Sequence, residues 1–151
     1  LGYSDPDRLG VGGWSYGGIL TNYVITSTDR FKAAMSGASG ALWVALYGHD
    51  QYQHWYEAAF GLPWENRELW EGLSPYNRVQ NITTPTLWMG GQDDWNVPIL
   101  TSEIMYQAMK RLGRDTLLVV YPEEDHGIDT PSYVKHLYEQ WSGWYDSHLK
   151  K

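Results

Sequence analysis

A serine flanked by glycines lies near the start of the chain, in the run Gly13-Trp14-Ser15-Tyr16-Gly17. An apolar segment precedes this Gly-x-Ser-x-Gly pattern and a helix-forming segment follows it, which is typical of a nucleophile elbow with the serine hydroxyl at its tip. We expect Gly13 and Gly17 to be glycines because side chains there would clash where the strand and the helix approach closely. The N–H of Tyr16, in the first helical turn, can then donate to an oxyanion that forms beside Ser15.

Two other interpretations of these glycines stay open when this stretch is considered alone. The first is an ordinary glycine-rich turn between a strand and a helix. The second is a dinucleotide-binding loop, because Gly10-Val11-Gly12 begins that pattern. Ser15 stands where the loop requires its third glycine, which argues against dinucleotide binding.

The chain contains acids and a histidine that could serve such a serine. Asp93 and Asp94 follow one apolar run, and His126 follows the next one, so the chain order is serine, acid, histidine. A serine hydroxyl is a weak nucleophile until a neutral imidazole takes its proton, and the imidazole needs a carboxylate that fixes its orientation. Asp125 is a poor candidate for that carboxylate because neighbouring side chains diverge. Asp93 and Asp94 both remain candidates from the spacing alone.

The other histidines suggest surface or packing roles more readily than chemistry. His49 and His54 lie in an aromatic-rich region and could touch a substrate, whereas His136 and His148 fall on the last predicted helix and are expected to face solvent. The chain has no cysteine and no His-Glu-x-x-His spacing. We therefore expect no metal site and no cofactor.

The elements that position these residues alternate between strands and helices. We expect strands at 9–14, 31–36, 86–89 and 116–121, and helices at 16–27, 51–60, 65–71, 98–112 and from 131 onward. This order predicts an α/β fold with a mainly parallel sheet of about four strands and flanking helices. The run 116–121 is continuously apolar, so we expect it to be buried on both faces. In such sheets the reactive loops gather beyond the carboxyl ends of the strands, which would bring Ser15, Asp94 and His126 together.

Length and composition narrow the class of protein. The 151 residues are long enough for one domain with a core, and a net charge of −7 argues against nucleic-acid and anionic-membrane partners. The sequence shows no 18-residue apolar run and no basic-then-apolar leader, and it leaves the compartment open. Trp and Tyr are unusually frequent, at 9 and 12 against 2 Phe, and eight of these 21 residues are concentrated between residues 41 and 76. That segment either shapes a pocket or packs against another part of the protein.

Taken together, these motifs resemble the prolyl oligopeptidase family of serine peptidases, in particular its acylaminoacyl-peptidase and dipeptidyl-aminopeptidase branch. The matching runs are Asp5-Pro6-Asp7-Arg8, the elbow, Ser74-Pro75, Gly91-x-x-Asp94-x-x-Val97-Pro98 and Pro122-Glu123-x-x-His126-Gly127. The resemblance implies Ser15 as nucleophile, Asp94 rather than Asp93 as acid, His126 as base, and a peptide or an ester as substrate.

Members of that family carry a β-propeller and the first half of the hydrolase domain before the elbow. The resemblance therefore implies that residues 1–151 are the C-terminal portion of an α/β-hydrolase catalytic domain. It also implies that the strand Leu9–Trp14 pairs along one edge with the upstream half or with another copy of the chain. The predicted function is that of a serine peptidase acting through an acyl-enzyme. The alternatives are a carboxylesterase with the same triad and a non-catalytic fragment that needs a complementary chain.

Overall fold

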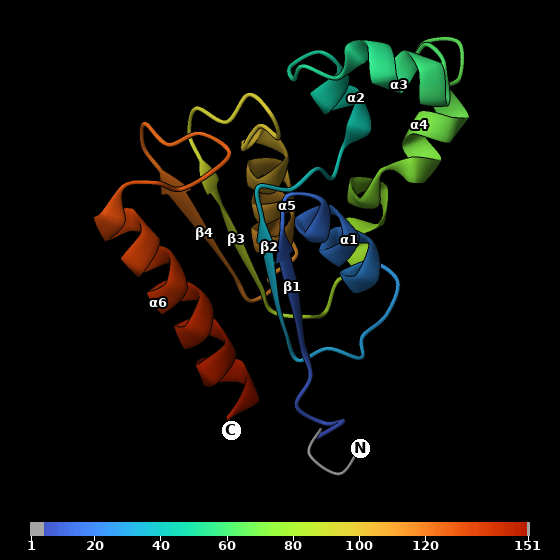
Figure 1. Ribbon diagram of the computed structural model, residues 1–151. Coiled ribbons are helices and arrows are strands. Elements are labelled where there is room, and N and C mark those ends of the chain that lie inside the picture. Colours follow the sequence, from blue (N-terminus) through green and yellow to red (C-terminus); the bar gives the residue numbers. More distant parts are fainter. Residues whose placement is uncertain (1–4, 151) are drawn as a thin grey trace.

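The computed structural model describes residues 5–150 and contains one four-stranded sheet, in the order β1-β2-β3-β4 (Figure 1). Neighbouring strands are all parallel, so the predicted α/β class is confirmed. Residues 1–4 and 151 of the predicted 1–151 unit lie outside the described residues. In chain order the elements are β1 (Gly10–Trp14), α1 (Tyr16–Ile25), β2 (Ala33–Gly37), α2 (Trp43–Tyr47), α3 (Gln53–Phe60), α4 (Arg67–Leu73), the 3₁₀ segment η1 (Pro75–Asn81), β3 (Thr86–Gly91), α5 (Leu100–Arg111), β4 (Thr116–Tyr121) and α6 (Pro131–Leu149).

Helices cover both faces of the sheet, with α6 on one side and α1 and α5 on the other (Figure 1). The two-residue period of the strands divides the core accordingly. Met35 and Leu87 pack with Leu137 of α6, whereas Ala34 and Trp88 face the opposite way and pack in a cluster with residues of α1 and α5. The central strands β2 and β3 are buried at every position.

The aromatic segment forms a small helical lobe beyond the carboxyl ends of the strands (Figure 1). Helices α2, α3 and α4 are held together by Trp43, Tyr56 and Trp70, and Ile19 of α1 joins the same cluster. Trp70 is 2% exposed, and its ring packs edge-on against that of Tyr56, with the ring centroids 5.9 Å apart. Trp43, Tyr56 and Trp70 therefore form the aromatic core of this lobe, which lies beyond the end of the sheet where the elbow sits.

Strand β4 differs from the prediction that it is buried on both faces. Among the described strands it pairs only with β3 and so forms one edge of the sheet, and its Leu117 is 38% exposed. An apolar run of six residues does not reveal whether a strand is central or at an edge, because that depends on which strands pair.

Strand β1 forms the other edge of the described sheet and packs closely against α6. The hydroxyl of Tyr145 donates to Val11 O at 2.8 Å, and a Cβ on Gly12 would lie 2.3 Å from that hydroxyl. Helix α6 can lie this close only because the strand carries glycine there.

Among residues 5–150, no helix combines the length and the apolar character needed to cross a bilayer.

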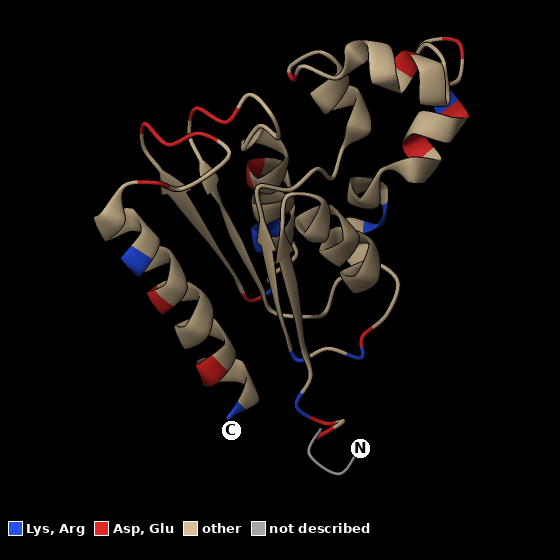
Figure 2. Cartoon of the chain, in the orientation of Figure 1, with Lys and Arg blue, Asp and Glu red and all other residues tan. Residues whose placement is uncertain are grey.

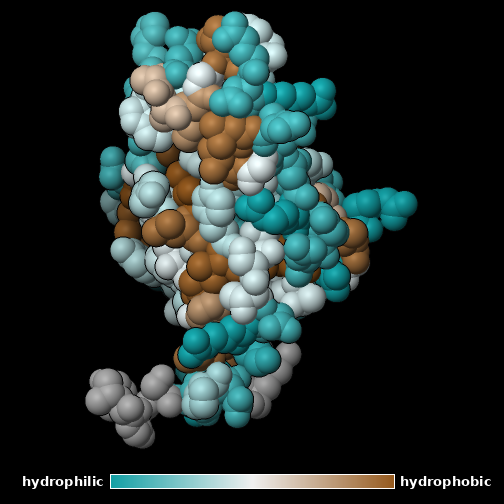
Figure 3. Space-filling model, turned by 90° about the vertical axis from the view of Figure 1, so that its right-hand side faces the viewer, coloured by the Kyte–Doolittle hydropathy of each residue, from teal (hydrophilic) through white to brown (hydrophobic). Residues whose placement is uncertain are grey.

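The side of α1 that faces the sheet combines an apolar contact made by Ile25 with a buried polar cluster. Asn22 is fully buried, its Nδ2 donates to Gly40 O at 3.0 Å, and Ser36 Oγ donates to Asn22 Oδ1 at 2.7 Å. The opposite side of α1 leaves Leu20 49% exposed, and apolar side chains are visible on this face of the molecule (Figure 3). A buried hydrogen-bonded network thus fixes α1 directly behind the elbow.

Candidate active site

Ser15 occupies the turn between β1 and α1 in a conformation that is rare for a residue with a side chain. Its φ is 59° and its ψ is −123°, and its N–H donates to Gly37 O at 2.9 Å. Keeping a non-glycine residue in such a region costs on the order of 1–3 kcal/mol, so the surrounding structure must hold it. The strand, the sharp turn and the helix are arranged as the motif predicts.

The glycines around Ser15 have different roles from those expected. A Cβ on Gly13 would lie 2.6 Å from the carbonyl carbon of Gly17, so Gly13 is required by close contact as predicted. A Cβ on Gly17 would meet nothing within 4 Å, so the expected clash of a side chain at position 17 is wrong. Gly18 faces the sheet instead, where a Cβ would lie 2.5 Å from Gly37 O. The backbone of Gly17 is thus what packs against Gly13, whereas Gly18 is the position where a side chain would clash with the sheet.

Ser15, His126 and Asp94 form a continuous hydrogen-bonded series. Ser15 Oγ lies 2.9 Å from His126 Nε2, and His126 Nδ1 lies 2.8 Å from Asp94 Oδ2. These residues come from the turn after β1, the loop after β3 and the loop after β4, all at the carboxyl ends of the strands. The imidazole is therefore placed to exchange protons with the serine hydroxyl on one side and to interact with a carboxylate on the other.

Asp94 is held in place by its own loop. Its Oδ1 accepts from the N–H groups of Asn96 at 2.8 Å and Val97 at 2.7 Å, and its side chain is 1% exposed. Two backbone donors to one oxygen leave the other oxygen directed at His126. The neighbouring Asp93 is exposed, so the structure brings Asp94 rather than Asp93 to the imidazole.

Gly91 allows the loop that carries His126 to approach the loop that carries Asp94 closely. A Cβ on Gly91, the last residue of β3, would lie 2.2 Å from Asp125 O and 2.3 Å from Glu124 O. The N–H of Asp93 donates to Glu124 O at 2.9 Å across the same contact. The two loops thus meet through their backbones, which brings His126 within reach of Asp94.

Tyr16 provides a backbone donor beside Ser15. It is the first residue of α1, and the N–H groups of a first helical turn have no acceptor within the helix. The helix dipole adds positive potential at the same point. The backbone of Tyr16 thus lies beside Ser15, and its phenol ring, which is 69% exposed, lines the adjoining pocket.

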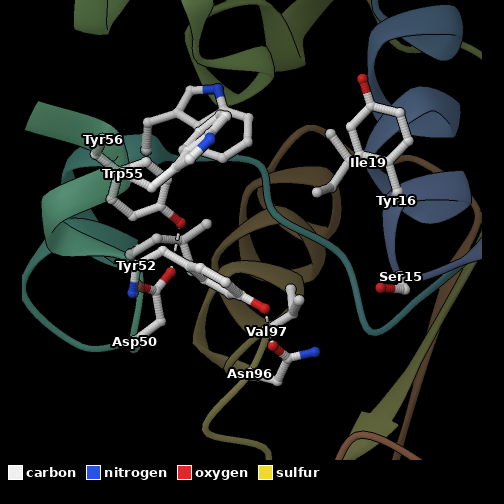
Figure 4. A pocket seen from close by; sticks show the side chains of 11 residues that line it. Ser15, Tyr16, Ile19, Asp50, Tyr52, Trp55, Tyr56, Asn96 and Val97 are labelled. Atoms are coloured by element: carbon white, nitrogen blue, oxygen red, sulfur yellow. Dashed lines mark hydrogen bonds between the residues drawn. The ribbon is translucent and has the colours of Figure 1, made fainter. Parts of the chain in front are cut away.

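A pocket of about 290 Å³ opens next to Ser15, beneath the helical lobe (Figure 4). Its walls are mainly apolar and aromatic. They consist of Ser15, Tyr16, Ile19, Trp43, Leu46, Asp50, Tyr52, Trp55, Tyr56, Asn96 and Val97. Tyr52 OH donates to Asn96 Oδ1, so the lobe and the loop that carries Asp94 join at the rim of the pocket. The pocket has the size and lining expected for a large apolar side chain.

One acid lies in this apolar surrounding. Asp50 is 7% exposed, its Oδ1 accepts from the N–H of Tyr52 at 2.8 Å, and its other oxygen accepts from Tyr56 OH. Burial raises the pKa of the Asp50 carboxyl above its ordinary value, and burial likewise raises the pKa of the Tyr56 phenol. These two groups therefore hold the pocket wall through a hydrogen bond between buried polar atoms.

All 151 residues match the family model described as "Prolyl oligopeptidase family". The chain belongs to the prolyl oligopeptidase family. The resemblance inferred from the motifs is thereby confirmed, and the four-stranded sheet is a partial α/β-hydrolase fold.

Individual relatives agree with the family assignment. The chain is 32% identical to "Uncharacterized peptidase YuxL" of Bacillus subtilis, covering 96% of this chain and 23% of the relative. It is 27% identical to "Acylamino-acid-releasing enzyme" of Arabidopsis thaliana, covering 99% and 21% respectively. Among solved structures, Pyrococcus horikoshii acylaminoacyl peptidase superposes with a TM-score of 0.92 at 28% identity, covering 98% of this chain and 25% of that one. The chain thus spans about a quarter of the length of these relatives.

The remaining histidines of this prolyl oligopeptidase family chain make other contacts or face solvent, although His49 lines a small pocket together with Asp94. His54 is fully exposed, and the ring of His49 packs at a tilt against that of Trp95, with the ring centroids 5.4 Å apart. His148 is not solvent-facing as expected, because it is only 12% exposed and its Nε2 lies 3.0 Å from Asp115 Oδ2. Within residues 5–150, no three His, Asp or Glu side chains converge in a way that could hold a metal ion.

Several residues of the site carry no signal that sequence reasoning could use. Asp50 and Asn96 are single polar residues inside an aromatic segment and a loop, and no spacing rule marks them. Gly91 belongs to a Gly-Gly pair, which by itself indicates only the end of a strand. Their roles arise from contacts between segments that are far apart in the chain.

Proposed function

We propose that Ser15, His126 and Asp94 are the catalytic triad of a serine peptidase. The observation that carries this proposal is the pair of contacts at the imidazole, 2.9 Å to Ser15 Oγ and 2.8 Å to Asp94 Oδ2. The strained turn that exposes Ser15 and the backbone donor of Tyr16 at the helix N-terminus support the same roles.

In this mechanism Ser15 Oγ attacks the carbonyl carbon of the scissile bond while its proton passes to His126 Nε2. Asp94 accepts a hydrogen bond from Nδ1–H and stabilises the imidazolium that forms. The N–H of Tyr16 donates to the oxyanion of the tetrahedral intermediate. His126 then returns the proton to the leaving amine, and a water molecule activated by His126 hydrolyses the acyl-Ser15 ester.

The aromatic pocket is the proposed binding site for the side chain on the acyl side of the scissile bond. It adjoins Ser15 and is lined mainly by apolar atoms, which favours an apolar or aromatic side chain. A solved relative with a TM-score of 0.91, "Acylaminoacyl peptidase in complex with Z-Gly-Gly-Phe-chloromethyl ketone", holds a ligand that ends in such a residue. The loops that carry Asp94 and His126 are rich in acids and contain no Lys or Arg (Figure 2), so strongly anionic peptides are disfavoured nearby.

We propose further that residues 1–151 are the C-terminal portion of the catalytic domain and that activity requires a complement. Strand β1 pairs only with β2 among the described strands, which leaves its other edge available for pairing. Tyr16 supplies one proposed oxyanion donor, and the family resemblance implies that a loop of the upstream half supplies the second. Loss of one such donor costs on the order of 10²–10³ in rate, so we expect residues 1–151 alone to react slowly.

A fluorophosphonate probe tests the triad, and it should be applied to the protein as its gene encodes it. The probe should label Ser15, and the Ser15→Ala variant should not react. Turnover of a peptide p-nitroanilide compared with a p-nitrophenyl ester then separates a peptidase from a carboxylesterase. Absence of labelling in the folded protein would contradict the triad and favour a non-catalytic role. Full labelling of residues 1–151 alone would contradict the need for a complement.

A further inference from the structure

Glu124 lies two residues before His126 and is 6% exposed although it belongs to a loop. Its carboxylate accepts from the N–H of Asp129 at 2.5 Å and from the N–H of Thr130 at 3.2 Å. These donors precede α6 immediately, where a helix leaves N–H groups without acceptors. The carboxylate therefore closes the loop between β4 and α6 across the segment that carries His126.

The backbone of His126 is also held by side chains on both sides. Its N–H donates to Asp125 Oδ1 at 2.8 Å, and its carbonyl accepts from Trp14 Nε1 at 2.9 Å. Trp14 immediately precedes Ser15, and its indole ring lies over Gly37, where a Cβ would be only 2.2 Å from a ring atom. The strand that presents the nucleophile thus also binds the backbone of the base.

Packing alone cannot keep the imidazole in place, because the side chain of His126 is 27% exposed. Its ring position depends on where the loop backbone lies, and the loop follows a strand at the edge of the sheet. A displacement of about 1 Å of a catalytic group can cost on the order of 10² in rate. Groups that fix this backbone therefore contribute to the rate of the reaction.

We infer that Glu124 is a positioning residue for the proposed base His126, and that it acts together with the indole N–H of Trp14. This inference rests on the proposed triad. The carboxylate of Glu124 makes its hydrogen bonds to the backbone of Asp129 and Thr130, so its effect on the imidazole is transmitted through the backbone of residues 124–130. Its neighbour Glu123 is exposed, so the two adjacent glutamates offer a matched pair for testing.

Ionisation of Glu124 is consistent with this arrangement. The hydrogen bonds from Thr130 and from the Asp129 backbone lower the pKa of the Glu124 carboxyl below its ordinary value. A glutamine at this position keeps the size of the side chain but replaces one acceptor oxygen with an NH₂ group, which cannot accept from a backbone N–H. Glu124→Gln therefore removes part of the clamp without leaving a cavity.

The test compares Glu124→Gln with Glu123→Gln in the protein as its gene encodes it. For Glu124→Gln we expect kcat and the rate of fluorophosphonate labelling to fall about tenfold to a hundredfold, with KM changed less than about threefold. The NMR signal of the proton between His126 Nδ1 and Asp94 should broaden or shift. Glu123→Gln should leave all three measurements unchanged.

A second variant keeps the inference testable if Glu124→Gln fails to fold. Trp14→Phe removes the indole N–H donor to His126, together with part of the ring that lies over Gly37, and should show a loss in kcat with KM nearly unchanged. Wild-type kcat per labelled serine in a folded Glu124→Gln protein, or in Trp14→Phe where the first variant does not fold, would overturn the inference. Failure of the wild-type protein to label at Ser15 would instead refute the proposed function itself.

Discussion

Replacing Gly91 with alanine tests whether the contact between two loop backbones sets the geometry of the proposed triad. Gly91 ends β3, three residues before Asp94, and its Cα faces the loop that carries His126. An added Cβ would lie 2.2 Å from Asp125 O and 2.3 Å from Glu124 O. Both neighbours are main-chain atoms, so no side chain can rotate out of the way, and the whole loop must move.

The size of the effect follows from those distances. Ordinary contact of a Cβ begins at 3.4 Å, so the loop has to move about 1.2 Å away from β3. That movement stretches the 2.8 Å contact between His126 Nδ1 and Asp94 Oδ2 and disturbs the 2.9 Å contact with Ser15. A misplacement of about 1 Å corresponds to roughly a hundredfold loss in rate, or about 2.7 kcal/mol in the activation barrier.

The assay is the second-order rate of Ser15 labelling by a fluorophosphonate, measured alongside kcat on a peptide anilide. The matched control is Gly143→Ala on α6, where a Cβ meets nothing within 4 Å and helix propensity improves by about 1 kcal/mol. We expect the control to react like the wild type and Gly91→Ala to lose about two orders of magnitude. A Gly91→Ala protein that labels within about twofold of the wild type would show that the loop relaxes without disturbing the imidazole, and the reasoning would fail.

Two further predictions concern stability. Asn22→Ala should lower the free energy of unfolding by about 1–3 kcal/mol, because it removes the acceptor of Ser36 Oγ and the donor to Gly40 O from a fully buried network; an unchanged urea midpoint would contradict this. The pKa of Glu124 is lower in the folded protein than its ordinary value of 4.5, so the ionised carboxylate stabilises the fold at pH values above 4.5. This stabilisation is lost as the pH falls through the lower pKa of the folded state. The acid-unfolding curve of Glu124→Gln should therefore lose that step, and identical curves for variant and wild type would refute the assignment.

The pattern around Ser15 was sufficient to predict the elbow, because the turn is local. A strand, a strained residue and a helix N-terminus all fall within about fifteen residues, and each has a requirement that residue type alone reveals. The requirement at Gly13 was predicted for the right reason. The one at Gly17 was not, since which of two adjacent helical glycines faces the sheet depends on how α1 rotates against β2.

The pairing of Asp94 with His126 could be expected only from chain order and from the rule for parallel sheets. The residues themselves left Asp93 and Asp94 equivalent, and the resemblance to the family separated them. In the structure the difference is physical, because two backbone N–H groups fix Asp94 Oδ1 while Asp93 faces solvent. The function of these residues stays a prediction until labelling is measured.

By itself the sequence determined the alternation of strands and helices, the class of fold and the loops that such a sheet brings to one end, because these depend on local periodicity and on the order of elements. Only the tertiary structure decided that β4 lies at an edge of the sheet and that Asp50 is buried in an aromatic pocket. It also decided that Gly91 packs against the backbone of the loop that carries His126, and that the Glu124 carboxylate closes this loop. These features are contacts between distant segments, and their free energy depends on distances that no single stretch of the chain encodes.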